Sequence, residues 1–149
     1  MSDANSKTIL LIEDNNDDVL LLKRVIARAG VAYPVQVVGD GAEAIKYLNR
    51  EAPFEDVEKF PLPYIILTDI KMPKRTGFDV LEWIRSHPAC RGIPTVILSS
   101  SSQDADVTRA YDLGASAYIV KPADGAVLDT IVHRLFSFWE VCRLPDKKC

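Results

Sequence analysis

The feature that most constrains the fold is a regular alternation of short apolar runs and longer amphipathic segments. The apolar runs are rich in Val, Ile and Leu and occur at Thr8–Ile12, Val35–Val38, Tyr64–Thr68, Thr95–Leu98 and Ala117–Val120. Runs of this length and composition predict strands that are covered on both faces, as in a parallel sheet. Helical periodicity follows each run, in the segments Asp17–Ala29, Gly41–Asn49, Gly77–His87, Gln103–Leu113 and Gly125–Cys142.

Alternating strands and helices predict an α/β fold in which a parallel sheet is doubly wound, with helices on both faces. For a sheet of this size with right-handed crossovers, the flavodoxin-like strand order 2-1-3-4-5 is favoured. The length of 149 residues fits a single domain, 1–149, with its core at about 7–140. The segment Glu51–Pro63 departs from the pattern, because its three prolines and four acidic residues predict a long surface loop.

The composition argues against several functions. The formal net charge is −3 and no run of Lys or Arg exceeds two residues, so binding to a nucleic-acid backbone is not expected. Met1–Ser6 lacks the apolar core of a signal peptide, and no apolar stretch approaches membrane-spanning length. The three cysteines show no CxxC spacing. These features predict a cytoplasmic protein that interacts with neither nucleic acid nor membrane.

The first predicted helix has recognisable ends. Asn15 or Asn16 is a suitable N-cap, and the acids Asp17 and Asp18 in the first turn suit the helix dipole. Gly30 is expected to end the helix.

Polar side chains follow the predicted strands where each strand ends. Glu13 and Asp14 follow the first strand, Asp69 the third, Ser99 the fourth and Lys121 the fifth. The carboxyl ends of parallel strands meet at one edge of the sheet, where ligand chemistry gathers. Three carboxylates at one edge would repel one another unless a cation lies among them. Because the ligands are oxygens with no histidine nearby, Mg²⁺ is favoured over zinc.

The same edge has the parts of a phosphoryl pocket. Lys121 supplies a fixed cation and Ser99 a hydrogen-bond donor, while the carboxylate of Asp69 is a candidate nucleophile for phosphorus. Each residue also has a plainer interpretation: Ser99 as a helix cap, Lys121 as a surface lysine, the acids as solvated strand ends. Their joint arrival at one edge favours the pocket.

The chain resembles the receiver domains of bacterial two-component response regulators. The matching stretches are Ile9-Leu10-Leu11-Ile12-Glu13-Asp14-Asn15, Asp69-Ile70-Lys71-Met72-Pro73, Gly77-Phe78-Asp79-Val80-Leu81, Pro94-Thr95-Val96-Ile97-Leu98-Ser99-Ser100 and Gly114-Ala115-Ser116-Ala117-Tyr118-Ile119-Val120-Lys121-Pro122. The resemblance implies that Asp69 accepts phosphate from the phosphohistidine of a histidine kinase. It also implies that Asp14 and Asp69 bind Mg²⁺ directly, Glu13 acts through bound water, and the backbone carbonyl of Lys71 completes the protein ligands.

The resemblance further implies a two-state switch. Lys121 would contact the phosphoryl oxygens, through a loop in which the Lys121–Pro122 bond is expected to be cis. Ser99 would move toward the phosphate and Tyr118 would rotate inward behind it, so that the signal is read on the last strand and its flanking helices. One departure is Lys71, where asparagine is common in relatives. Its ammonium would pair with Glu13 or the phosphoryl group, or simply remain solvated.

The chain ends about one helix past Lys121, which predicts a stand-alone receiver whose output is a protein contact. The last helix carries two apolar faces; Leu128, Val132, Leu135 and Trp139 form one, and Val127, Ile131, Phe138 and Val141 form the other. One face is expected to cover the sheet and the other to bind a partner or a second copy. The loop Glu51–Pro63, the serine run Ser99–Ser102 and the ending at 135–139 resemble small receivers that work with phytochrome-type kinases.

Three other functions fit the sequence less well. An aspartate-nucleophile phosphohydrolase uses a second carboxylate two residues after the nucleophile, where this chain has Lys71, so turnover of an external substrate is not expected. A receiver-like binding module that is never phosphorylated usually lacks the acceptor, the acids or the lysine, all of which are present. A dinucleotide-binding domain would need GxGxxG after the first strand, and none is there.

Overall fold

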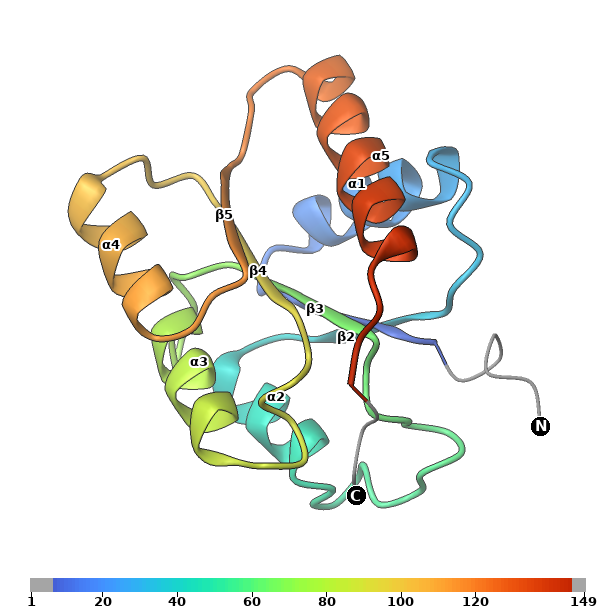
Figure 1. The fold of residues 1–149 in the computed structure, drawn as a ribbon, viewed down its shortest axis with the longest axis vertical. Helices are drawn as coiled ribbons and strands as arrows, with labels where there is room; N and C mark the ends of the chain where they lie inside the picture. The colour runs from blue at the N-terminus through green and yellow to red at the C-terminus, as the bar shows by residue number, and fades with distance from the viewer. Residues whose placement is uncertain (1–6, 146–149) are drawn as a thin grey trace.

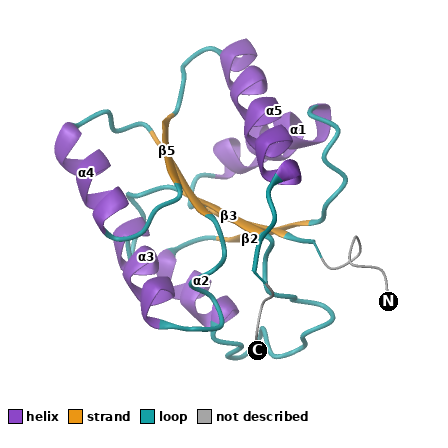
Figure 2. Ribbon diagram, in the orientation of Figure 1, coloured by secondary structure: helices purple, strands orange, loops and turns teal. Residues whose placement is uncertain are grey.

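The computed structural model describes residues 7–145, which form a parallel sheet flanked by helices on both faces (Figure 1; Figure 2). The elements in chain order are β1 (Ile9–Ile12), α1 (Asn16–Arg28), β2 (Val35–Val38), α2 (Gly41–Leu48), β3 (Ile65–Thr68), α3 (Gly77–Ser86), β4 (Thr95–Ser99), α4 (Asp104–Asp112), β5 (Ala117–Val120) and α5 (Gly125–Val141). The strand order is β2-β1-β3-β4-β5, with every pairing parallel. The predicted flavodoxin-like fold is therefore confirmed.

The sheet separates two apolar layers, because successive strand residues point to opposite faces. Ile9 and Leu11 of β1 pack with α1 and α5, whereas Leu10 and Ile12 pack with α2 and α3. Figure 1 shows the same division, with α1 and α5 on one side of the sheet and α2, α3 and α4 on the other. Helices cover both faces of the sheet, which explains why most strand residues are apolar.

The helices begin with capping side chains that fix where the chain leaves each strand. Asn15 is the N-cap of α1, and its side chain accepts a hydrogen bond from the N–H of Asp18 at 3.1 Å. Thr76 and Asp79 form a reciprocal capping box at α3. Gly30, at φ +79°, follows the end of α1 as predicted.

The segment Glu51–Pro63 contains neither helix nor strand, as predicted, but it is not purely a surface loop. Phe54 and Leu62 are buried in the layer below α2 and α3. The ring of Phe54 packs 5.2 Å from that of Tyr47, whose hydroxyl donates to the carbonyl of Pro61 at 2.8 Å. Composition alone missed these anchors because prolines and acids outnumber the buried residues.

Helix α5 has one buried and one exposed apolar face. Leu128, Val132 and Phe136 are buried against the sheet, and the hydroxyl of Tyr64 at the start of β3 donates to the carbonyl of Trp139 at 2.6 Å. Phe138, 58% exposed, lies on the opposite face. The expected two-faced helix is therefore present.

The two tryptophans lie toward the carboxyl ends of their helices. Trp139 belongs to the last turns of α5, and Trp83 of α3 stacks on His87 with ring centroids 3.6 Å apart. No helix within residues 7–145 is long and apolar enough to cross a membrane. The expectation drawn from Met1–Ser6 lies outside the described residues.

Candidate functional site

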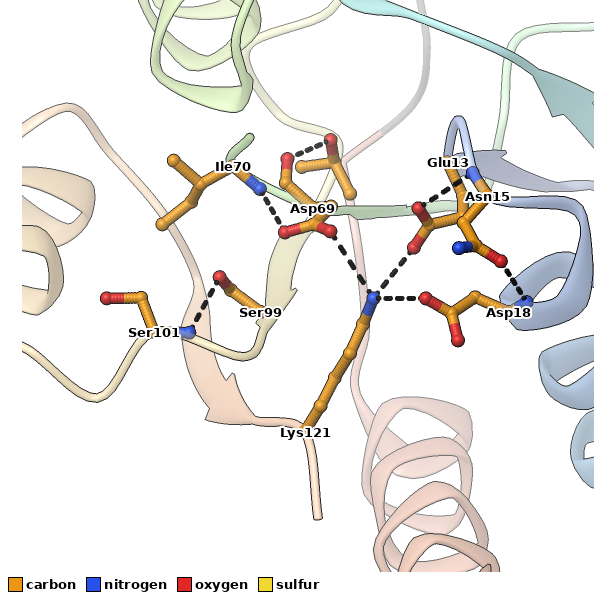
Figure 3. A network of polar contacts seen from close by, with 9 residues as sticks. Glu13, Asn15, Asp18, Asp69, Ile70, Ser99, Ser101 and Lys121 are labelled. Carbon is orange, nitrogen blue, oxygen red and sulfur yellow. Dashed lines mark hydrogen bonds and ion pairs between the residues drawn. The ribbon is translucent and has the colours of Figure 1, made fainter. Parts of the chain in front are cut away.

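The carboxyl edge of the sheet brings the predicted residues Glu13 and Asp69 together around the ammonium group of Lys121 (Figure 3). The Nζ atom of Lys121 lies 2.8 Å from Glu13 Oε1, 3.3 Å from Asp69 Oδ2 and 3.3 Å from Asp18 Oδ2. An ammonium has three N–H donors, so these three carboxylates use all of them. The sheet order places β1 and β3 side by side, which is why Glu13 and Asp69 converge on a lysine from the edge strand β5.

The backbone around Asp69 is tightly fixed. Its N–H donates to the carbonyl of Ile12 at 3.2 Å, extending the β1–β3 ladder by one residue. Its Oδ1 accepts from the N–H of Ile70 at 2.7 Å, so the carboxylate is oriented from within its own turn. Gly77 lies directly against the Asp69 carbonyl, where a Cβ atom would collide with it. The first residue of α3 therefore has to be glycine for the loop to close over Asp69.

Glu13 is the most buried acid of the network, with a side chain only 2% exposed. Burial raises the pKa of Glu13, against the lowering effect of Lys121 and of the N–H of Asn15. Burial alone would lower the pKa of Lys121, but the hydrogen bond that its ammonium donates to Glu13 and the charges of Asp69, Glu13 and Asp18 raise it to about 12. The lysine is thus a permanent cation at neutral pH, held by a surplus of negative charge.

The other predicted residues occupy different positions at this edge. Asp14 is exposed and lies outside the network around Lys121. The side chain of Lys71 is also exposed, and both oxygens of Glu13 are engaged by Lys121 and by the N–H of Asn15. Lys71 therefore does not pair with Glu13, and its side chain is solvated in the unphosphorylated protein.

Ser99 is buried at the end of β4 and links the acceptor edge to α4. Its hydroxyl accepts from the N–H of Ser101 at 3.2 Å, and it does not cap α4, whose N-cap Gln103 has no capping side chain. The hydroxyl of Tyr118 donates to the carbonyl of Ser101 at 2.8 Å. The half-buried Tyr118 therefore already contacts the loop that follows Ser99.

One expectation about the loop after β5 is wrong. The cis peptide bond within residues 7–145 is Ala52–Pro53, and the bond from Lys121 to Pro122 is trans. The trans preference of an X-Pro bond is only about 0.5–1 kcal/mol, so sequence does not decide which isomer a given turn holds. In the trans form the N–H of Lys121 donates to the carbonyl of Ser99 at 2.8 Å.

Asp18 is the site residue that the sequence interpretation missed. We expected it only to complement the dipole of α1, yet its carboxylate reaches Lys121. A signal was available, because the first turn of a helix that begins four residues after β1 lies above the same sheet edge as Glu13. The hydrogen bond from the N–H of Asp18 to the side-chain oxygen of Asn15 fixes this turn and so places the Asp18 side chain there.

The donor atoms at this edge suit a hard divalent cation, since they are carboxylate and carbonyl oxygens. In the part of the chain that the structure describes, however, no three acidic, His or Cys side chains converge to hold a metal ion. The ammonium of Lys121 lies among the carboxylates of Glu13, Asp18 and Asp69 and offsets part of their charge. Mg²⁺ usually takes only one or two carboxylates and keeps several waters. Asp14 is exposed just past β1 and Asp69 follows the neighbouring strand β3, so two carboxylates are available at this edge.

The fold and this edge together define a receiver domain: five parallel strands in the order 2-1-3-4-5, with acids after β1 and β3 and a lysine after β5. The sequence pattern of the response regulator receiver domain matches residues 9–133, and the chain belongs to that family.

Several relatives are similar over nearly their whole length. The response regulator Rcp1 of Synechocystis sp. is 32% identical, over 97% of this chain and 99% of its own. Its Mn²⁺-bound crystal structure superposes with a TM-score of 0.84. The phosphorylated cyanobacterial phytochrome response regulator RcpA is 37% identical with a TM-score of 0.86, covering 94% of this chain and 99% of its own. RPA3017, from red light signaling in R. palustris, is 33% identical with a TM-score of 0.89, covering 95% and 99%.

Proposed function

We propose that the protein is a phosphorylation-dependent response regulator in which Asp69 accepts a phosphoryl group from a histidine kinase. The observation that carries the proposal is the position of Asp69, at the carboxyl end of a central strand, with Oδ2 3.3 Å from the ammonium of Lys121. That geometry offers both a carboxylate nucleophile and a fixed cation for the transferred group. The phosphorylated structure of RcpA, a relative of nearly equal length, supports the same chemistry.

The transfer follows from the orientation of the Asp69 carboxylate. One oxygen of Asp69 forms a bond to phosphorus while the bond from phosphorus to the imidazole nitrogen of the donor breaks, and the imidazole leaves with the electron pair. The N–H of Ile70, 2.7 Å from Oδ1, holds the carboxylate in place during attack. Lys121 neutralises charge that gathers on the phosphoryl oxygens, and needs no proton transfer because its pKa is about 12.

A divalent cation would be held by Asp14 and Asp69, with the Lys71 carbonyl, and by Glu13 through water. When bound, the ion would offset the negative charge that the phosphoryl oxygens bring to the acids. The Mn²⁺-bound structure of Rcp1 supports a divalent ion at a receiver of this kind, and Mg²⁺ is our choice for this chain because its ligands are hard oxygens.

Phosphorylation would be read through Ser99 and Tyr118. Ser99 would turn its hydroxyl from the N–H of Ser101 toward the phosphoryl group, releasing the loop that accepts the hydroxyl of Tyr118. The output surface would then be β5 with the exposed face of α5, where Val120 and Phe138 are exposed. A second copy of the chain is the proposed occupant of this surface.

The relatives also suggest a kinase. RcpA is a phytochrome response regulator and RPA3017 acts in red light signaling, and both are similar to this chain over nearly its whole length. We therefore propose a phytochrome-type histidine kinase in the cytoplasm as partner. Turnover of an external substrate is not proposed, because Lys71 stands where a phosphohydrolase would need an acid. The net charge of −3 argues against nucleic acid as a target.

The test is the mass of the intact protein after incubation with acetyl phosphate and Mg²⁺. We expect one added phosphoryl group in the wild-type protein and none in Asp69→Asn, which keeps the size of the side chain. Asp40→Asn is the matched control, since Asp40 caps α2 away from Lys121. Absence of an adduct in the wild type, also with a cognate kinase, would refute the phosphoacceptor role.

A further inference from the structure

The contact between Asp18 and Lys121 gives the site a carboxylate that the phosphoryl chemistry does not use. Asp18 projects from the first turn of α1, while Glu13 and Asp69 follow β1 and β3. Figure 3 shows Glu13 and Asp18 on one side of the Lys121 nitrogen and Asp69 on the other. Two of the three N–H donors of the lysine are therefore directed away from the acceptor.

The three carboxylates do not hold the lysine equally. Glu13 is buried, lies 2.8 Å from Nζ and is fixed a second time by the N–H of Asn15. Asp18 lies at 3.3 Å with a side chain 41% exposed, so water can replace the lysine at low cost. Asp18 is thus the partner that Lys121 can release, and Glu13 the partner that it keeps.

The position of the Asp18 carboxylate is fixed by hydrogen bonds within the turn that leads into α1. The N–H of Asp18 donates to the side chain of Asn15 at 3.1 Å, and the N–H of Asn15 donates to Glu13 at 3.2 Å. One turn of chain thereby sets both acids relative to each other. A cavity of about 60 Å³, lined by Asp18, Lys121 and apolar side chains of α1, β4 and α5, lies beside the pair. It gives the lysine stem room to shift when its nitrogen changes partners.

We propose that Asp18 is a positioning residue that holds the Lys121 ammonium toward α1 and competes for it with the phosphorylated Asp69. The inference rests on the proposed phosphoacceptor role of Asp69. A phosphoryl group brings three acceptor oxygens and more negative charge than a carboxylate. One N–H of Lys121 already points to Asp69, and a second can turn to the phosphoryl oxygens only when the lysine gives up its most exposed partner, Asp18. Asp18 therefore weakens the interaction of Lys121 with the phosphoryl group and shortens the lifetime of the phosphorylated state.

The experiment compares Asp18→Asn with Asp17→Asn. Both substitutions remove one negative charge from the first turn of α1, but Asp17 does not contact Lys121. Beryllofluoride with Mg²⁺ serves as the phosphoryl mimic, and its affinity is measured by titration with ¹⁹F NMR. We expect Asp18→Asn to bind it about two- to fivefold tighter than wild type, as fits the loss of one exposed ion pair. Asp17→Asn is expected to bind it as the wild type does.

Two further readouts separate positioning from a merely structural role. Asp18→Glu keeps a carboxylate within reach of Lys121 and is expected to restore the affinity toward that of wild type. The ¹³Cε resonance of Lys121, followed by NMR in unphosphorylated protein, is expected to move in Asp18→Asn and to stay in Asp17→Asn.

The outcomes are distinguishable. Equal affinities in the two asparagine variants, or weaker binding in Asp18→Asn, would overturn the role of Asp18 and leave the acceptor role of Asp69 intact. If the wild type neither binds beryllofluoride nor gains a phosphoryl group from acetyl phosphate, the proposed function fails, and the role of Asp18 fails with it.

Discussion

Lys121 makes its shortest contact with Glu13, at 2.8 Å, and not with Asp69, at 3.3 Å. The closest partner of the lysine is thus Glu13, a buried acid that does not accept the phosphoryl group, and the contact with the proposed acceptor Asp69 is longer. Removing one partner of a buried ion pair leaves the other charge buried without a counter-charge, and this penalty accounts for most of the resulting loss of stability.

We therefore expect Lys121→Met to be destabilising, because the buried Glu13 loses its counter-charge. The free energy of unfolding should fall by about 2–3 kcal/mol, less than for a fully buried pair since the lysine side chain is 18% exposed. Urea denaturation measures this. Adding Glu13→Gln should restore most of the loss, and a double variant as unstable as the single one would contradict the explanation.

Gly77→Ala should destabilise the protein because the new methyl group meets the carbonyl of Asp69 and the backbone of Ile70. Overpacking of this kind costs about 1–3 kcal/mol, and the displaced acceptor loop should also slow phosphorylation by acetyl phosphate. Gly125→Ala is the control, since nothing lies within 4 Å of a Cβ there. Equal thermal midpoints for the two variants would show that the loop accommodates the methyl group.

Alkaline pH should weaken the anchoring of the Glu51–Pro63 segment. Burial raises the pKa of Tyr47 to about 12 from an ordinary value of 10.0. Below pH 10 the phenol is neutral in both states and its full contribution is present. Between pH 10 and 12 the unfolded chain ionises first, so up to roughly 3 kcal/mol of stability is lost. The free energy of unfolding of the wild type and of Tyr47→Phe, measured by denaturation at several pH values across this range, checks the prediction. The stability of the wild type should fall relative to that of Tyr47→Phe as the pH rises. Parallel curves of stability against pH would refute the prediction.

The exposed face of α5 should carry the contact between copies. Phe138→Asp is expected to keep the protein monomeric in sedimentation with beryllofluoride, because a charge would enter an apolar interface. Val57→Asp is matched in exposure, at 52% against 58%, and lies on the loop before β3, so it should behave as wild type. The dimer proposal would be refuted if the wild type stayed monomeric at high concentration both with and without beryllofluoride.

Much of the fold could be predicted because its determinants are local. Every predicted strand and helix is present, and the helix ends agree to within a few residues because Asn15, Thr76 and Gly30 act on their own turns. The loop Glu51–Pro63 was only half predicted. Phe54 and Leu62 reach the core through packing against Tyr47, a contact that no local pattern reveals.

The site, like the fold, has a part that could be predicted from the sequence and a part that could not. Strand order and strand ends were enough to place Glu13, Asp69, Ser99 and Lys121 at one edge, because topology fixes where parallel strands finish. The choice of partners within that edge depends on side-chain reach. The sequence therefore did not show that Lys121 would lie among the acids, or that Asp18 would join them.

The location of Trp83 and Trp139 has a practical consequence. Helices in this fold run opposite to the strands, so both indoles lie toward the edge of the sheet remote from Asp69. The charge of the transferred phosphoryl group should therefore have little direct effect on their fluorescence emission. Any change in intrinsic fluorescence on activation would report that a rearrangement had propagated through α3 or α5, and its kinetics would time the response of the helices separately from the chemistry.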